Sequence, residues 1–220
     1  MTFSILARDA GTGALGGAAA TGSLCVGGWV LRGDPRAGMS ASQGASPSTL
    51  WGEEVLARMA GGQDAATAVA GVTGPDRGRD WRQLAALDRN GGSAVFTGTG
   101  NSDWHGSLSA EGVVVSGNLL TGSAVLTAML SGFGRATGTF AERLIAALAA
   151  AEAAGGDSRG LQSAALLVVA DDSAPLTLRI DWSEDPVAAL SALHDRTRAS
   201  PYAEWFPTVP TRADPERGHG

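Results

Sequence analysis

The sequence contains no lysine, and all 16 of its basic residues are arginine. A P-loop, a Schiff-base enzyme and a Ser-Lys dyad each require a lysine amine, so the composition excludes these three chemistries. The formal net charge is -6, and the arginines are scattered along the chain. A protein that binds nucleic acid needs basic residues gathered in a patch or stripe, so we expect no nucleic-acid partner.

Paired cysteines, clustered histidines and long apolar runs are also missing. Cys25 is the only cysteine, which excludes an internal disulfide and a cysteine-based zinc cluster. His105 and His194 do not have the spacing of a metal site. The N-terminus does not resemble a signal peptide, and no apolar run approaches about 18 residues. We therefore expect a cytoplasmic protein with no membrane partner, no metal and no organic cofactor.

Turn-forming residues divide the chain into strands, then helices, then strands again. Apolar or alternating runs predict strands over residues 3–8, 14–21, 24–31, 37–43, 81–88, 94–98, 112–116, 163–170 and 176–182. Helical spacing and helix stop signals predict helices over residues 50–60, 64–72, 123–133, 140–154 and 186–198. With 44% hydrophobic residues, the chain can form one sizeable core. We expect one domain over residues 1–198 and a loosely ordered tail, rich in proline and charge, over residues 199–220.

This order of elements predicts an α+β fold. We expect two antiparallel sheets that stack face to face, with helices on both outer faces, which is a four-layer αββα sandwich. A generic α+β domain gives a similar order of elements, so the periodicity alone leaves that alternative open.

Thr2 follows the initiator Met1 and opens the first apolar strand. Removal of Met1 would place a hydroxyl nucleophile and a free α-amine, with an ordinary pKa of about 7.7–8.0, on one residue. An N-terminal threonine and its own amine are one recognised pair of nucleophile and base. The alternative is that a small β-branched residue simply suits a strand.

The glycine-rich turn after this strand predicts a hairpin. If the turn centres on residues 11–12, Thr2 lies opposite Thr21, and Ser23 comes close to the nucleophile. The same glycines also match the pattern GxGxxG of a dinucleotide site. That site needs a helix directly after the glycines, and the further glycines in this stretch disfavour a helix. We therefore expect the hairpin.

Several short stretches of the sequence resemble one bacterial family. They are TFSILARD at 2–9, RQ at 82–83, FTG at 96–98, GNLL at 117–120 and AGGDSRGLQSAAL at 154–166. The family that they resemble is domain of unknown function 1028. It is grouped with the N-terminal nucleophile (Ntn) hydrolases, which use an exposed N-terminal Thr, Ser or Cys to cleave amide bonds within the four-layer fold. The resemblance implies that Thr2 is the nucleophile.

The sequence departs from this family at one point. The family tends to have Ala-Thr-Gln where residues 41–43 read Ala-Ser-Gln, so that Ser42 stands in the place of the threonine. The chain also cannot supply the lysine that proteasome-like relatives place near the nucleophile. The resemblance does not indicate a substrate, and a fold alone does not choose a reaction.

An amide hydrolase needs a donor for the oxyanion of its tetrahedral intermediate. Asn118 follows Gly117 at the end of a predicted strand, and its side-chain amide donates without adding charge. We predict that Asn118 is this catalytic donor. The alternative is a turn asparagine that bonds its own backbone.

Asp157 and Arg159 lie between a helix stop and a predicted buried strand, where charges need partners. We predict that Asp157 orients the terminal amine as a catalytic residue and that Arg159 binds a substrate carboxylate in a two-pronged bond. The two residues can instead pair with each other or brace the loop, and the sequence does not say which of them is structural. Ser163, Gln43 and Ser23 are further candidates for contacts with the substrate.

Together these residues predict an Ntn-type amidohydrolase that cleaves an amide bond of a small molecule or short peptide. Thr2 is the nucleophile, and its free amine is the base after Met1 removal. One alternative is a non-catalytic binding or assembly protein on the same fold, with a blocked N-terminus. Another is an enzyme on this fold whose chemistry does not use Thr2. The sequence leaves open whether the chain forms a homo-oligomer.

Overall fold

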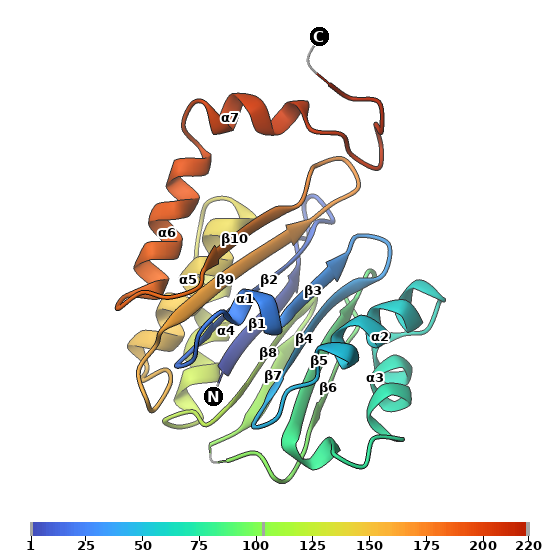
Figure 1. Ribbon diagram of the computed structural model, residues 1–220, viewed down its shortest axis with the longest axis vertical. Coiled ribbons are helices and arrows are strands. Elements are labelled where there is room, and N and C mark those ends of the chain that lie inside the picture. Colours follow the sequence, from blue (N-terminus) through green and yellow to red (C-terminus); the bar gives the residue numbers. More distant parts are fainter. Residues whose placement is uncertain (1, 103, 219–220) are drawn as a thin grey trace.

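The computed structural model describes residues 2–102 and 104–218. Its larger sheet has six antiparallel strands in the order β10-β9-β2-β1-β8-β7. The N-terminal strand therefore lies inside the sheet, between β2 and β8 (Figure 1). The bounds of these strands are β1 Thr2–Arg8, β2 Leu15–Thr21, β7 Gly106–Ala110, β8 Val113–Asn118, β9 Ser163–Val169 and β10 Leu176–Ile180.

The smaller sheet has four antiparallel strands in the order β3-β4-β5-β6. Its bounds are β3 Leu31–Asp34, β4 Gly38–Gly44, β5 Arg82–Asp88 and β6 Ser93–Thr97. Contacts of β4 with β1, and of β5 with β8, show that it stacks face to face on the larger sheet. The middle of the molecule is thus two antiparallel sheets, as predicted.

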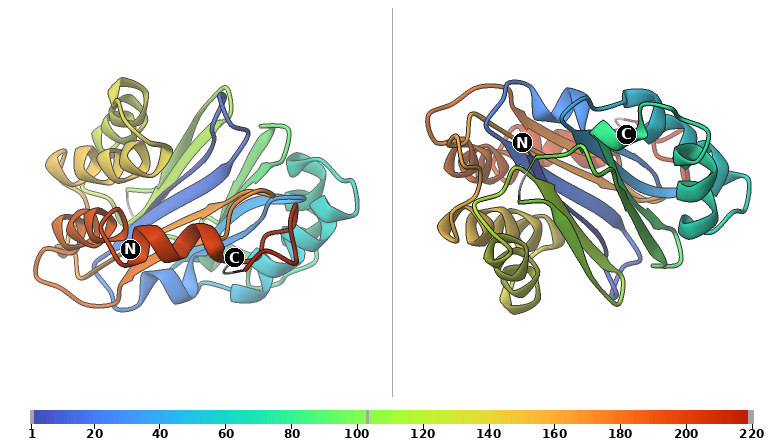
Figure 2. Two further views of the ribbon diagram at one scale, coloured as in Figure 1. Left: turned by 90° about the horizontal axis from the view of Figure 1, so that it is seen from above. Right: turned by 90° about the horizontal axis from the view of Figure 1, so that it is seen from below.

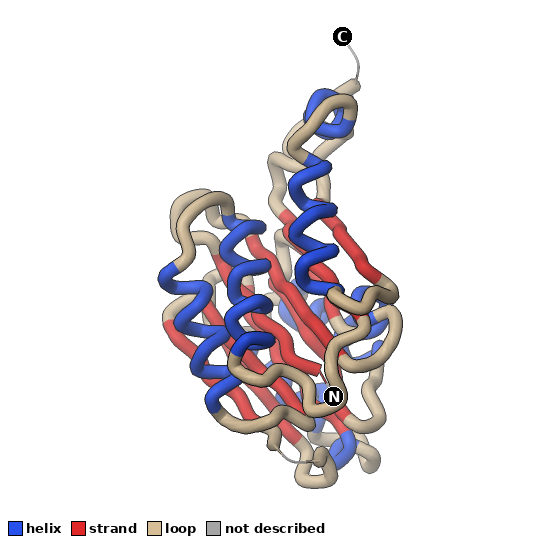
Figure 3. Tube along the Cα trace, turned by 90° about the vertical axis from the view of Figure 1, so that its left-hand side faces the viewer, coloured by secondary structure: helices blue, strands red, loops and turns tan. Residues whose placement is uncertain are grey.

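Helices cover the outer face of each sheet (Figures 1 and 2). The larger sheet carries α4 (Ala124–Arg135), α5 (Phe140–Ala153) and α6 (Pro186–Thr197). Figure 3 shows the helices of this layer lying over the strands. The smaller sheet carries α2 (Thr49–Ala60) and α3 (Ala65–Thr73). The result is an α+β sandwich with helices outside and sheets inside.

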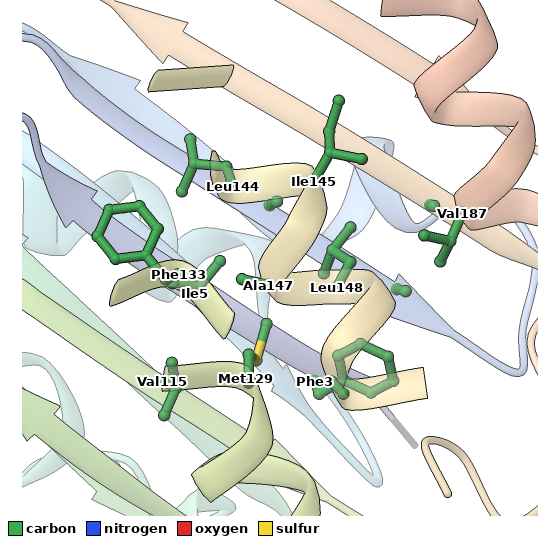
Figure 4. Packing of buried hydrophobic residues seen from close by; sticks show 14 of the residues in the cluster. Phe3, Ile5, Val115, Met129, Phe133, Leu144, Ile145, Ala147, Leu148 and Val187 are labelled. Atoms are coloured by element: carbon green, nitrogen blue, oxygen red, sulfur yellow. The ribbon is translucent and has the colours of Figure 1, made fainter. Parts of the chain in front are cut away.

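Strand alternation divides the apolar residues between three interfaces, because successive side chains of a strand point to opposite faces. Phe3 and Ile5 face outward into the cluster beneath α4 and α5 (Figure 4). Leu6 faces inward, into a second cluster between the two sheets. A third cluster lies between the smaller sheet and α2 and α3. One strand, β1, therefore contributes to two of the three cores.

The β1–β2 hairpin has the predicted register. The paired residues run from Thr2↔Thr21 at the open end to Arg8↔Leu15 next to the turn. Gly13 in this turn has a φ of 76°, which glycine adopts without strain. Since the glycines lead into a strand and not into a helix, the dinucleotide interpretation is wrong.

The strand predicted over residues 24–31 is wrong. Residues Val26–Trp29 form a short helix, α1, and β3 begins only at Leu31. The apolar residues of this stretch suggested a strand, but two glycines let it coil closely against the sheet. A Cβ on Gly27 would lie 2.8 Å from the Cβ of Ala165, closer than real Cβ atoms come. The apolar residues of a short stretch do not indicate how closely its backbone packs against a distant strand.

The sequence also did not predict β7. Its residues, GSLSA, are mostly small or polar, and Ser107–Ala110 are exposed at the edge of the larger sheet. Its residues do alternate between small or apolar and polar, but Leu108 is the only large apolar side chain, so the alternation is too weak to indicate a half-buried strand. Seven α-helices occur among the described residues, of which the shortest are α1 and α7 (Tyr202–Trp205).

The segment from residue 199 to 218 follows α6 along the end of the sandwich (Figure 1). It contains α7 and the 3-10 turn η2 (Phe206–Thr208); the other 3-10 turn, η1 (Arg79–Trp81), precedes β5. Its residue Thr211 is buried, and the amide of Ala213 donates to the carbonyl of Asp171 at 2.9 Å. The domain boundary at residue 198 stays a prediction. Within the described residues, every helix is too short or too polar to cross a lipid bilayer.

Candidate active site

Two rows of polar side chains face each other at one end of the layer between the sheets. In the large-sheet row, Ser163, Thr21, Thr2 and Asn118 lie side by side on β9, β2, β1 and β8. Leu6, four residues after Thr2, faces the small sheet, and the period of two puts Thr2 on the same face. The small-sheet row is made of the side chains Gln43, Gln83 and Thr97, which lie side by side on β4, β5 and β6.

Thr2 lies at the wall of a cavity of about 620 Å3. Thr2 is 8% exposed, and its Oγ1 donates to the Oγ1 of Thr21 at 3.2 Å. Ser23, Gln43 and Arg159 line the same cavity. The structure therefore brings four of the seven predicted site residues to one hollow, together with the predicted partner Thr21.

Asn118 stands beside Thr2 on the neighbouring strand, about 4.8 Å away in the pairing direction. It is 1% exposed, and neither its Nδ2 nor its Oδ1 has a hydrogen-bond partner among the described residues. The alternative of a turn asparagine is wrong, because Asn118 is the last residue of β8. An unpaired buried amide costs about 1–3 kcal/mol, so this arrangement calls for an explanation beyond stability.

Asn118 is not among the described residues that line the cavity, but Leu119, which follows it, is. Its φ is 57°, in the left-handed region that a leucine rarely adopts. Its amide donates to the carbonyl of Ser102 at 3.2 Å, which holds the backbone in this conformation. Strained backbone of this kind is concentrated at functional sites in proteins. Here it redirects the chain directly after the unpaired amide.

The small-sheet row ties both strands of the site together. Gln43 Nε2 donates to Gln83 Oε1 at 2.7 Å and to the Thr2 carbonyl at 3.4 Å. Gln83 Nε2 in turn donates to the carbonyl of Gly117 at 3.1 Å and to Thr97 Oγ1 at 2.9 Å. The two glutamines thus connect the small sheet to the strand of Thr2 and to the strand of Asn118.

Gln83 was not among the predicted site residues. Its only signal in the sequence was the pair Arg82-Gln83 within the stretches that resemble the family. Nothing local marks it, since Gln83 comes 81 positions after Thr2 and meets its neighbourhood through the stacking of the sheets. Gln43 Oε1 is buried and lacks a hydrogen-bond partner among the described residues.

The departure from the family at Ser42 lies outside this site. Ser42 and Gln43 are neighbours on β4 and point to opposite faces of the sheet. The Ser42 hydroxyl donates to the carbonyl of Ser48 at 2.7 Å, just before α2 begins. A serine in place of threonine keeps the hydroxyl that makes this bond.

Asp157 and Arg159 pair with each other. The Asp157 carboxylate, whose side chain is fully buried, accepts from the Arg159 amide at 2.8 Å and from its Nη2 at 3.2 Å. It also accepts from the Gly22 amide at 2.5 Å, directly after the end of β2. Asp157 therefore braces its own loop against the strand of Thr21, and Arg159 reaches the cavity wall. The proposed contact of Asp157 with the terminal amine stays a prediction.

Ser163 lies behind the cavity wall. Its hydroxyl donates to the carbonyl of Ser23 at 2.7 Å and accepts from the amide of Val26 at 3.1 Å. It does not line the cavity, but it fixes the loop that carries Ser23 into the lining. The position supports an indirect role for Ser163, and its predicted contact with substrate stays untested.

Metal ligands are not gathered in the described part of the chain. No three His, Cys, Asp or Glu side chains of residues 2–102 and 104–218 are placed to hold a metal ion. Arg159 is the single charged residue among the described residues of the cavity lining. The chemistry available there is that of hydroxyl, amide and guanidinium groups.

Comparison with known proteins identifies a family and similar solved structures. Residues 2–190 match the family of unknown function DUF1028. The crystal structure of protein SPO2555 from Silicibacter pomeroyi, also assigned to DUF1028, is 53% identical in sequence and has a TM-score of 0.96. The likeness covers 100% of this chain and 96% of that one. No curated protein matches the chain.

Proposed function

This chain belongs to the DUF1028 family of unknown function, and we propose that it is an Ntn-type hydrolase that cleaves an amide bond of a small molecule or short peptide. The proposal rests mainly on Asn118, a buried amide without partner in the described residues, which stands directly beside a cavity-lining Thr2. The stacked sheets with helices outside agree with the four-layer fold of the Ntn hydrolases. Thr2 also has the position that this class requires, at the start of an inner strand.

The nucleophile and base are both supplied by Thr2 once Met1 is removed. Thr2 Oγ1 attacks the amide carbonyl, and the neutral α-amine accepts the hydroxyl proton, directly or through one water. The same proton then passes to the leaving amine as the carbon-nitrogen bond breaks. Water hydrolyses the resulting ester and returns Thr2 to its free form. The hydroxyl of Thr21, at 3.2 Å from Thr2 Oγ1, orients the nucleophile on the cavity side.

Asn118 supplies the donor for the oxyanion of the tetrahedral intermediate. Its Nδ2 carries two N–H donors, and no acceptor among the described residues occupies them. A donor already in place needs no reorganisation when negative charge develops on the oxygen. Losing one such donor typically raises the barrier by about 2.7–4 kcal/mol. The cost of leaving this amide unpaired in the resting protein is thereby explained by its use during the reaction.

The rival proposal is a binding or assembly protein of the same fold whose N-terminus stays blocked. Such a protein has no need of an unpaired buried amide beside Thr2, and a leucine at position 118 would leave its stability equal or higher. The intact mass of the purified protein separates the two proposals. A mass without Met1 is expected for the hydrolase, and retention of Met1 in most molecules would favour the rival.

The reaction itself is tested by substitution at Thr2. The unmodified protein is screened against N-acyl amino acids, dipeptides and cyclic amides, with the released amine as readout. We expect Thr2→Ala to abolish hydrolysis and Thr2→Ser to keep part of it, because serine retains a hydroxyl and a terminal amine. Thr67→Ala, at an exposed position of α3, is the matched control and keeps full activity. Equal activity of all variants would contradict the mechanism.

A further inference from the structure

We propose, on the basis of the function above, that the substrate is an amide that carries both a free carboxylate and a large apolar group. The proposal comes from the residues that line the cavity next to Thr2, which are mainly apolar and, as far as the structure describes them, include a cation but no anion. Arg159 is the single charged residue among the described residues that line the cavity, and none of these residues carries a carboxylate. Its volume of about 620 Å3 falls within the usual range for small-molecule sites.

One wall of the cavity is apolar and open to solvent. Leu24 and Trp29 are each 53% exposed, although large apolar side chains usually lie inside a protein. Both line the cavity, next to Val26, Val30 and Pro47. When exposed apolar residues cluster around one cavity, they indicate a surface that a ligand covers. An apolar group of the substrate would remove this wall from water.

The apolar wall is held in place by close packing. Leu24 precedes the turn into α1, where Cys25 has a φ of 60°, and Trp29 is the last residue of this helix. A Cβ on Gly27 would lie 2.7 Å from Arg179 Cγ, so the helix sits directly on the sheet. The Ser163 hydroxyl holds both sides of the turn, because it donates to the Ser23 carbonyl and accepts from the Val26 amide. The wall is thus formed before any ligand arrives, which lowers the entropy cost of binding.

Arg159 supplies the recognition of a carboxylate. Its side chain is 45% exposed at the cavity, and the fully buried side chain of Asp157 holds the guanidinium through Nε at 3.3 Å and Nη2 at 3.2 Å. A guanidinium held in a fixed plane is well suited to bind a carboxylate. A cationic substrate group would find no carboxylate in the described lining. The cavity therefore selects anionic over cationic substrates.

Matched substrates test this inference without any change to the protein. N-acetyl-phenylalanine is compared with its carboxamide, which lacks the negative charge, and with N-acetyl-serine, which lacks the apolar group. We expect kcat/KM to be at least about tenfold higher for the first compound than for either of the others, because each of the others lacks one contact. A tenfold difference corresponds to about 1.4 kcal/mol. Equal kcat/KM for the three compounds would overturn the proposal.

Two variants assign the preference to residues. Arg159→Gln should abolish the preference for the carboxylate over the carboxamide, mainly through KM, and Trp29→Ser should reduce the preference for the apolar group. Arg36→Gln, at an exposed position outside the cavity, should leave both preferences unchanged. Arg159→Lys keeps the charge but loses the planar two-pronged geometry, so it should retain only part of the preference, and it serves where Arg159→Gln does not fold. An undiminished preference in either folded variant would overturn the role of Arg159.

Failure of this inference is distinguishable from failure of the proposed function. Hydrolysis that depends on Thr2 but ignores the carboxylate and the apolar group leaves the function standing and contradicts the substrate class. If no amide is hydrolysed, calorimetric binding to the Thr2→Ala variant decides. Tighter binding of N-acetyl-phenylalanine than of its carboxamide supports the substrate class, and equal binding contradicts it.

Discussion

The two ends of the layer between the sheets differ sharply, although the same strands form both. At the end away from Thr2, the layer is filled by an apolar cluster whose strand residues include Leu6, Met39 and Leu87, all of them fully buried. At the Thr2 end, they are the hydroxyl and amide side chains of the two facing rows. One end of each strand therefore supplies stability, and the other end supplies chemical groups.

The difference extends to hydrogen bonding. Four buried side-chain atoms of the described residues lack a hydrogen-bond partner, and three of them belong to Asn118 and Gln43 in the facing rows. Each such atom costs about 1–3 kcal/mol. None of the four atoms belongs to a described residue at the apolar end. We infer that the polar end is kept for function at a cost that the apolar end offsets.

The largest expected effect on stability is at the apolar end. Leu6 is fully buried, so Leu6→Ala leaves a cavity and should lower the free energy of unfolding by about 2–5 kcal/mol, measured by urea denaturation. The folded variant should keep the kcat of the unmodified protein, because Leu6 contacts none of the proposed catalytic groups. Leu50→Ala, at an exposed position, is the control and should change stability by less than about 0.5 kcal/mol. A large loss of kcat in folded Leu6→Ala would show that the two ends are not separate.

The opposite result is expected at the polar end. Asn118→Leu removes the unpaired amide and keeps a similar volume, so the free energy of unfolding should stay constant or rise. The kcat should fall about 10²- to 10³-fold, because the oxyanion loses its donor. Denaturation and steady-state kinetics on the same preparation measure both effects. Asn90→Ala, in an exposed turn, should change neither.

A loss of stability in Asn118→Leu would indicate that the amide is bonded in the native protein, for example by an ordered water. Retained kcat would remove Asn118 from the mechanism. Either outcome would weaken the contrast between the two ends of the layer, because that contrast depends on an unpaired amide that serves the reaction.

The part of the site that the sequence predicts is the part set by local pairing. A turn centred on residues 11–12 places Thr2 opposite Thr21, and the structure has this register. Ser23 follows at the same end and lines the cavity. The contacts of Gln83 cannot be obtained in this way, because they cross from one sheet to the other between segments distant in sequence. Propensity and periodicity describe a strand, and they do not say which strand lies opposite it in a stacked sheet.

The same limit explains the errors in the fold. The edge strand β7 has a single large apolar residue, the exposed Leu108, to reveal it, and α1 depends on how closely Gly27 approaches Ala165. Helices with a long apolar stripe, such as α4 and α5, were predicted with bounds close to those observed. An element that buries one continuous face carries its own signal, whereas a short element depends on its neighbours.

The smallest expected effects test whether a buried polar residue affects catalysis because it lies in one of the two facing rows, and not merely because it is polar. Gln83→Leu removes the bonds to Gln43 and to the Gly117 carbonyl, and it should lower the free energy of unfolding by about 1–3 kcal/mol. It should also lower kcat by about 10- to 100-fold with little change in KM, since small misplacements of reacting groups have effects of this size. The apolar and cationic walls of the cavity do not depend on Gln83, which is why KM should stay nearly constant.

Ser42→Ala is the matched change on the opposite face of the small sheet. It removes one buried hydrogen bond, to the Ser48 carbonyl, and should lower the free energy of unfolding by about 0.5–1.5 kcal/mol without changing kcat. Both variants thus weaken a buried polar contact of the same sheet, but only Gln83→Leu loosens the rows that hold Thr2 beside Asn118. Equal kcat in the two variants would mean that Gln83 contributes only to stability. The residues that serve the reaction would then be those of the large-sheet row.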